Sequence, residues 1–190
     1  MKKVFASAIV ASALAAPAFA APVEYKIDSR HTFPVFEVNH LGFSTQRGRF
    51  NKAEGKVVLD REAKTGSVEL DIDVESLDMG FEMWDEHMAD EGFFDTANHP
   101  TMTFRSSELV FEGDKVVRAE GTLTLLGHTR PVTLTVSNFN CRPHPMFKKE
   151  ACGADISTTI KRSDFGMTKL LPAVGDMVRI YSPVEAIRED

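Results

Sequence analysis

Apolar and polar residues alternate with a period of two along most of this chain. The segment SVELDIDV, for example, places Val68, Leu70, Ile72 and Val74 on one face. Comparable runs recur at roughly ten-residue spacing with Gly, Asp and Asn between them, which is typical of antiparallel strands joined by turns. Such alternation buries one face of each strand and leaves the other in water. The pattern predicts an all-β sandwich or barrel, and Pro183 in the last run indicates an edge or a bulge.

Residues 75–100 depart from this period. Apolar residues recur there at helical spacing, between acidic ones, at Met79, Met83, Trp84, His87 and Met88. We predict one short helix over residues 82–89, followed by a loop that carries Phe93 and Phe94. A helical insertion of this kind closes one end of a barrel or flanks it.

The first twenty residues have the three parts of a secretory signal peptide. Lys2 and Lys3 are basic, residues 4–16 are apolar, and an A-x-A signal ends at Ala20. We predict cleavage between Ala20 and Ala21, which leaves residues 21–190 as a single domain. No later stretch reaches the roughly 18 apolar residues of a membrane-spanning helix. For a Gram-negative source, these features predict a periplasmic protein.

The charge excludes some partners. The chain has 22 basic and 28 acidic residues, and loss of the two lysines of the signal peptide leaves 20 basic residues and a net charge of −8. A nucleic acid or an anionic membrane surface is therefore not expected as a partner.

Two cysteines, Cys141 and Cys152, flank a loop between two predicted strands. In an oxidising compartment they are expected to form a disulfide. A redox-active pair is disfavoured because C-x-x-C spacing is absent. A zinc site with His144 lacks an evident fourth ligand, so we predict no metal site.

The large apolar residues are mostly Phe and Met. The chain has 14 Phe and 8 Met but only 2 Tyr and 1 Trp. These side chains suit either an ordinary packed core or the lining of an apolar cavity in a barrel of about eight strands. Composition alone leaves both interpretations open.

Strand alternation adds polar candidates to this interior. If Phe36 and Val38 point inward, His40 does too. If Ile156 and Ile160 point inward, Arg162 shares their direction, and both polar groups would lie where a ligand's head group is fixed. The other interpretation is that Arg162 pairs with an acid such as Asp164 or Asp28 to hold a strand end.

No recognised catalytic motif is present. The sequence has no G-x-S-x-G, H-E-x-x-H or phosphate loop, and its six histidines are dispersed. In the segment GTLTLLGHTRPVTLTV, His128 and Arg130 follow a glycine between two strand patterns. We interpret this segment as a hairpin whose tip is solvated.

Four further stretches, together with the signal sequence, resemble the YceI-like family. They are YKIDSRHTFPVFEVNHLGFSTQRGRF, DEHMADEGFFDTANHPTMTFRSS, AEGTLTLLGHTRPVTLTV and TTIKRSDFGM, spread over residues 25–167. The resemblance implies an extended eight-stranded antiparallel lipocalin-like β-barrel with a helix beside it. It also implies an apolar tunnel that holds an isoprenoid lipid, either an isoprenoid quinone or a polyprenyl phosphate. One departure is Leu126, which occupies a position where family members often have histidine.

Motif and alternation together give the candidate site. The polar end is assigned to His31, His40, Arg162, Ser163 and Asp164. The tunnel lining is assigned to Phe36, Val38, Phe43, Phe50, Phe94, Phe104, Phe165 and Met167.

Three function classes follow from these observations. The first is a periplasmic lipid carrier without catalysis or a required cofactor, which contacts a membrane or membrane protein transiently during transfer. The second is an envelope stress or partner-binding protein with an apolar patch around Trp84, Phe93 and Phe94. The third is an enzyme acting on a prenyl lipid, with His40, or His31 with Asp28, as its acid–base group.

Overall fold

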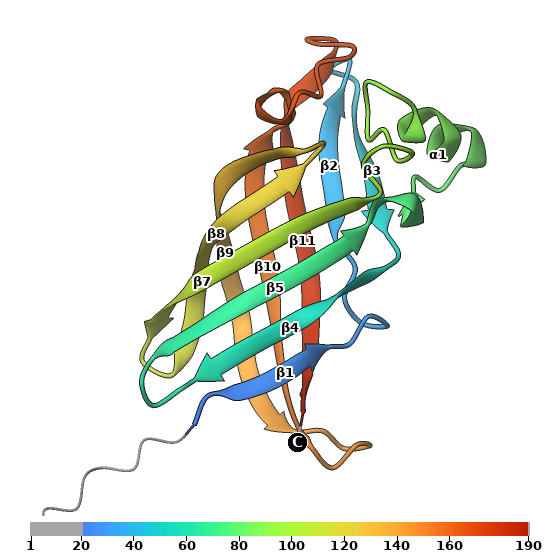
Figure 1. Ribbon diagram of the computed structural model, residues 1–190. Coiled ribbons are helices and arrows are strands. Elements are labelled where there is room, and N and C mark those ends of the chain that lie inside the picture. Colours follow the sequence, from blue (N-terminus) through green and yellow to red (C-terminus); the bar gives the residue numbers. More distant parts are fainter. Residues whose placement is uncertain (1–20, 190) are drawn as a thin grey trace, which may run out of the picture.

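The structure is a computed structural model that describes residues 21–189, most of which lie in one antiparallel sheet (Figure 1). The predicted signal peptide, residues 1–20, lies outside the described residues. The strands are β1 Val23–Ile27, β2 Val35–His40, β3 Ser44–Phe50, β4 Ala53–Asp60, β5 Thr65–Asp73, β6 Leu77–Asp78, β7 Thr101–Glu112, β8 Lys115–Leu125, β9 His128–Pro143, β10 Glu150–Lys161 and β11 Val174–Arg188. The helices are the α-helix α1 Glu82–Ala89 and two short 3-10 helices, η1 Val74–Ser76 and η2 Arg162–Phe165.

The sheet closes on itself as a barrel. Its hydrogen-bonded order is β1-β4-β5-β7-β8-β9-β10-β11, and β11 pairs again with β1. The predicted eight-stranded antiparallel barrel is therefore confirmed. Because β1 and β11 pair with each other, neither presents an exposed edge to other chains at this seam.

Three of the eight wall positions are each filled by two consecutive short strands. Beside β11, β2 pairs with its first half and β1 with its last residues. The next position is shared by β3 and β4, which are separated by Asn51 and Lys52, and the third by β5 and β6 with η1 between them. Pro183 lies between the part of β11 that pairs with β2 and the part that pairs with β1. The proline therefore occupies a gap in this ladder rather than the edge of the sheet.

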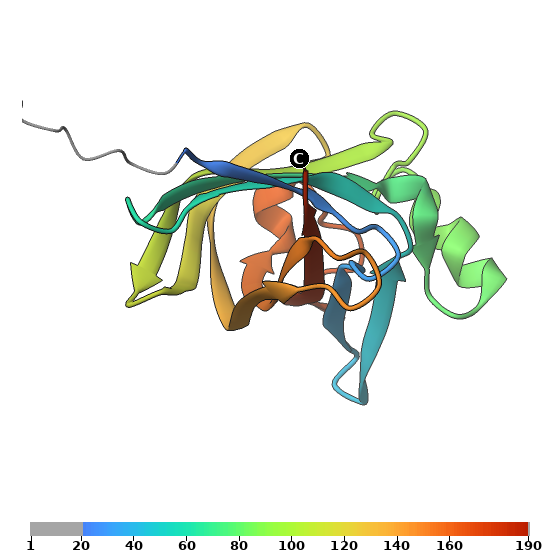
Figure 2. The ribbon, with the colours of Figure 1, turned by 90° about the horizontal axis from the view of Figure 1, so that it is seen from below.

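The two ends of the barrel differ. At the mouth end lie the β2–β3 turn, the β10–β11 connection and α1, which packs beside β6 outside the barrel wall (Figures 1 and 2). At the lower end lie the start of β1, the end of β11 and the turn between β9 and β10. The helix has the predicted bounds, Glu82–Ala89. Within the described residues, no helix has the length and apolar character needed to span a bilayer.

Alternation along the strands places the apolar side chains inside. On β7, Met102 and Phe104 are buried, and on the neighbouring β8 so are Leu123 and Leu125. Gly48 lies opposite Phe36, and a Cβ atom at Gly48 would approach the Phe36 ring to 2.5 Å. The glycine therefore makes room for a ring that projects into the barrel.

The β8–β9 hairpin turns at Leu126 and Gly127, both with positive φ, which matches the twist of a tight hairpin. His128 and Arg130 are exposed at its tip, as the solvated-tip interpretation predicts. The cysteines Cys141 and Cys152 face one another on β9 and β10 and form the predicted disulfide.

Candidate ligand cavity

A cavity of about 390 Å³ occupies the half of the barrel nearest the mouth end. Its walls come from β2, β3, β5 and from the strands β7 to β11, and α1 with its following loop covers one side. Six of the eight predicted lining residues border it, namely Phe36, Val38, Phe50, Phe94, Phe104 and Met167. The volume falls in the range of small-molecule binding sites.

The exposure of the wall residues supports an open interior. Val38, Ile156, Val178 and Ile180 all line the cavity, yet each retains partial exposure, whereas Phe104 in the same wall is 3% exposed. Inward-facing side chains in a filled core are in contact on all sides. The exposed surface of these residues therefore faces the cavity, and the barrel is open near its mouth rather than packed throughout.

The lower half of the barrel is filled. Tyr25, Ile27, Leu59, Ala119 and Ala186 are each at most 5% exposed, and none of them borders the cavity. Both interpretations of the Phe- and Met-rich interior are thus correct, each for one half of the barrel.

Histidine and tryptophan side chains frame the mouth. His40, at the end of β2, borders the cavity, and its ring centroid lies 6.2 Å from that of Trp84 on α1. His87 of the same helix also borders the cavity, and its ring makes an edge contact with Phe93 at 4.9 Å. Leu170, from the β10–β11 connection, completes this side of the opening.

Arg162 borders the cavity on the face that strand alternation predicts, together with Ile156, Thr158 and Ile160. Its side chain is 4% exposed. The guanidinium donates four hydrogen bonds of 2.9–3.0 Å to backbone carbonyls, those of Met167, Lys169, Val174 and Gly175. Burial lowers the pKa of Arg162, and the negative charge of Asp176 opposes this effect.

These four bonds make Arg162 the internal support of the β10–β11 connection. The acids predicted as its partners, Asp164 and Asp28, are absent from its hydrogen bonds; Asp164 is exposed and Asp28 binds Arg30 and His31. A guanidinium has five N–H groups, so one is left beyond the four carbonyl bonds.

Ser163 and Asp164 lie beside the cavity rather than in its lining. Ser163 donates from its backbone N–H and its hydroxyl to the carboxylate of Asp176, at 2.9 and 2.8 Å. These hydrogen bonds, led by that from the backbone N–H, lower the pKa of Asp176. The Ser163 hydroxyl therefore has a structural partner at the start of β11.

The remaining predicted residues lie away from the cavity. His31 lies in the β1–β2 connection, where its Nδ1 is 2.9 Å from an Asp28 carboxylate oxygen and the side chain is exposed. Phe43 lies in the β2–β3 turn and is 89% exposed, whereas Phe165 is 1% exposed and packs in η2 without bordering the cavity.

Sequence reasoning omitted several cavity residues from the candidate site. Trp84 was assigned to the helix and to a partner-binding patch, Met88 to the helix only, and Thr158 and Ile180 were not singled out, although all four border the cavity. The helical spacing that placed Trp84 on one face of α1 was the available signal, but it did not reveal which surface that face covers. Thr158 shares its strand face with Ile156 and Arg162, so alternation would have identified it.

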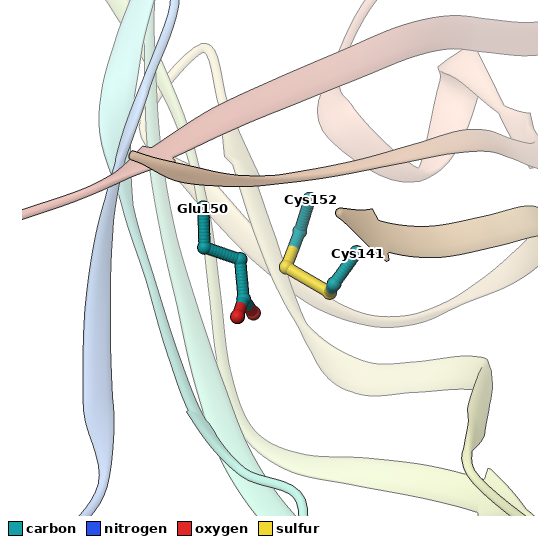
Figure 3. A group of neighbouring side chains, drawn as sticks. All are labelled: Cys141, Glu150 and Cys152. Carbon is teal, nitrogen blue, oxygen red and sulfur yellow. A yellow bond between two sulfur atoms is a disulfide. The ribbon is translucent and has the colours of Figure 1, made fainter. Parts of the chain in front are cut away.

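A hydrogen-bonded group seals the lower end. The Tyr25 hydroxyl donates to Glu150 Oε1 at 2.8 Å, and Arg61 donates to the same oxygen at 2.8 Å. Burial, reinforced by the bond to Glu150, raises the pKa of Tyr25 to about 12. Figure 3 shows the Glu150 carboxylate beside the disulfide of Cys141 and Cys152.

The cysteines and Glu150 form the one cluster within the described residues whose ligand atoms lie close enough to hold a metal ion, within 4.8 Å of one another. In this structure the two sulfurs are bonded to each other, and Glu150 accepts hydrogen bonds from Tyr25 and Arg61. The cluster therefore serves as a cross-link between strands.

The sequence of this chain is similar to those of other bacterial proteins. A UPF0312 protein of Pseudomonas aeruginosa (strain LESB58) is 33% identical over the full length of both chains. One from Vibrio cholerae (strain O395) is 32% identical over 88% of this chain and 89% of its own.

Solved structures share the same barrel. BcnA of Burkholderia cenocepacia superposes with a TM-score of 0.69 at 26% identity, covering 84% of this chain and 99% of BcnA. A polyisoprenoid binding domain from Saccharophagus degradans, implicated in plant cell wall breakdown, superposes with a TM-score of 0.65 at 18% identity, covering 88% of this chain and 99% of its own. The model of the YceI-like domain matches residues 25–186, and this chain belongs to the YceI-like family.

Proposed function

We propose that the protein binds an isoprenoid lipid inside the barrel and carries it through the periplasm without changing it chemically. The observation that carries this proposal is the apolar cavity, enclosed by the barrel wall and open beside His40 and Trp84. The polyisoprenoid binding domain of S. degradans, which shares the fold, supports the choice of lipid.

Burial of the prenyl tail supplies the driving force. Removal of apolar surface from water contributes roughly 25 cal/mol per Å². The walls contain Ile, Leu, Val, Phe and Met from many strands, so an extended tail would lose its contact with water over its length inside the cavity.

The head group is expected at the polar end of the cavity. His40 contributes an imidazole there, and Arg162 contributes the N–H that its four carbonyl partners leave over. An N–H donor suits both a quinone carbonyl and a phosphate oxygen. Isoprenoid quinones and polyprenyl phosphates are therefore the two ligand classes to be tested.

Exchange with a membrane is proposed at the same end. Six exposed or partly exposed apolar side chains, which we call the mouth rim, lie in the β2–β3 turn, on or beside α1 and in the β10–β11 connection: Leu41, Phe43, Phe81, Met83, Trp84 and Leu170. A backbone hydrogen bond of 2.8 Å joins Leu41 to Ala173, which ties the β2–β3 turn to the β10–β11 connection. Apolar side chains around an opening reduce the cost of moving a lipid tail between the cavity and a bilayer.

The decisive experiment is extraction of lipid from protein purified from its native host, followed by mass spectrometry. We expect one prenyl lipid per protein, and reconstitution of the emptied protein with added quinones or polyprenyl phosphates. A protein that is isolated empty and takes up neither class would refute the proposal.

The same preparation tests catalysis and partner binding. Conversion of the bound lipid, lost in His40→Ala with binding retained, would assign an enzyme instead. Capture of a specific protein that depends on Trp84 but not on bound lipid would favour the partner-binding class.

A further inference from the structure

The cavity has a floor. Along β10 it extends from Arg162 down to Ile156, about 20 Å at a rise of roughly 3.3 Å per residue. Ile156 pairs with Ser182 on β11, which is the lowest cavity residue of that strand. Below this level the next inward pair, Ala154 and Val184, is still partly exposed, and burial is complete one layer lower, where Cys152 and Ala186 are 7% and 2% exposed.

The residues below the cavity form layers that follow the strand register. Ala154 and Val184 face each other one inward position below Ile156 and Ser182, and Cys152 and Ala186 follow one position lower. Ile27 on β1 pairs with Ala186 and is 5% exposed. The lower barrel is thus closed across its width at the level of Ile27.

The lowest layer is tied in place. Tyr25 is 1% exposed, and its hydroxyl bonds Glu150 on β10, although β1 and β10 are separated by β11 at this end. Glu150 is held by Arg61 as well, and the disulfide of Cys141 and Cys152 lies beside it. A lipid tail that enters at the mouth therefore has no exit at the lower end.

We propose that this floor limits the length of the ligand, so that Ile156 and Ile27 set the longest prenyl tail that the barrel can bury. The inference rests on the proposed function and adds a selection by chain length to it. Each prenyl unit adds apolar contact until the tail reaches the floor. Further units must stay outside the mouth in water, where they add no affinity.

The test uses isoprenoid quinones that share one head group and differ only in the number of prenyl units. Trp84 is the only tryptophan and borders the cavity, so its fluorescence reports binding to the whole protein. We expect affinity to rise at least about tenfold per added unit up to a break, and to stay level or fall beyond it.

Two variants should move the break in opposite directions. Ile156→Phe fills the end of the cavity, so the break should shift to a shorter tail. Ile27→Ala removes side-chain atoms below the cavity, so the break should shift to a longer tail. The matched control is Thr159→Phe, which adds the same ring on the exposed face of the same strand and should leave the break in place.

The outcomes separate the two proposals. If no quinone of any length binds, the proposed function fails and the floor has nothing to measure. If quinones bind without a break, or if the break stays in place in Ile156→Phe, the floor inference is wrong while lipid binding stands. Because Ile156→Phe fills existing space, it keeps the test valid even if Ile27→Ala does not fold.

Discussion

At the scale of single residues, Arg162 holds part of the backbone and also borders the cavity. Its charge is buried, and buried charges require partners. Here the partners are carbonyls of residues 167–175, which gather the β10–β11 connection around one guanidinium. The mouth of the cavity therefore depends on a residue that also borders it.

Substitution of Arg162 should be costly even without ligand. Arg162→Met leaves four carbonyls without their donor, and we expect the free energy of unfolding of the emptied protein to fall by about 3 kcal/mol or more. Arg162→Lys keeps the charge but replaces the planar fork with a single ammonium, so most of the loss should persist. Denaturant unfolding measures both. A change below about 1 kcal/mol in Arg162→Met would contradict this structural role.

Tyr25 gives a prediction about pH. Its pKa is raised to about 12 in the folded protein from 10.0, so the neutral hydroxyl is favoured by folding. The stabilisation is complete below pH 10 and is lost as pH rises through the interval from 10 to 12. We expect the wild type to lose roughly 2 kcal/mol more stability across this interval than Tyr25→Phe, which cannot ionise. Equal pH profiles of unfolding in the two proteins would contradict the assignment.

At the scale of elements, the sequence predicted best where a simple repeat governs side-chain direction. Alternation by two gave the inward faces that carry Phe36, Val38 and Arg162, and the 3.6-residue period gave α1 its bounds. Alternation ends with the strand, however. Phe43 lies in a turn, and Ser163 and Asp164 lie in η2, where successive side chains no longer alternate between two faces. Their directions required the three-dimensional structure.

The helix region contains one residue that packs against the barrel and one that is exposed on the surface. Phe94, in the loop after α1, is 7% exposed. Its ring centroid lies 5.7 Å from that of Phe36 and 5.4 Å from that of Phe50. We expect Phe94→Ala to lower the free energy of unfolding by about 3–5 kcal/mol. Met83 on α1 is 65% exposed, so Met83→Ala should change the free energy of unfolding by no more than about 0.5 kcal/mol. Similar thermal unfolding of the two variants would show that the loop does not seal the barrel.

At the scale of the whole molecule, the sequence predicted the number of wall positions but not how they are filled. Three positions consist of two strands each, because the chain breaks at residues 28–34, at Asn51–Lys52 and at η1. The presence of a cavity was also beyond the sequence. It depends on the summed volumes of side chains from many strands, and counts of Phe and Met are the same for an open and a filled barrel.

The mouth rim yields a prediction about transfer. Phe43→Ser and Phe81→Ser remove exposed rings outside the cavity, so affinity for a quinone should be unchanged. Transfer of that quinone to zwitterionic vesicles should slow at least about tenfold in the double variant, because the lost rings no longer insert among the lipids. Met146→Ser, which alters a side chain at the lower end that is 78% exposed, should transfer at the wild-type rate. An unaffected double variant would place the contact elsewhere.

The shared partner of β1 and β2 has a consequence for how the chain matures. Both β1 and β2 need β11 as a pairing partner, and the paired part of β11 extends to Arg188. The barrel cannot close until β11 has been synthesised and can pair with these strands. Until then β1, β2 and β10 each present an unpaired edge, which favours aggregation. Chaperones that hold extended chains should therefore stay bound until β11 has paired, and stop codons just before Val174 should yield insoluble rather than shortened functional protein.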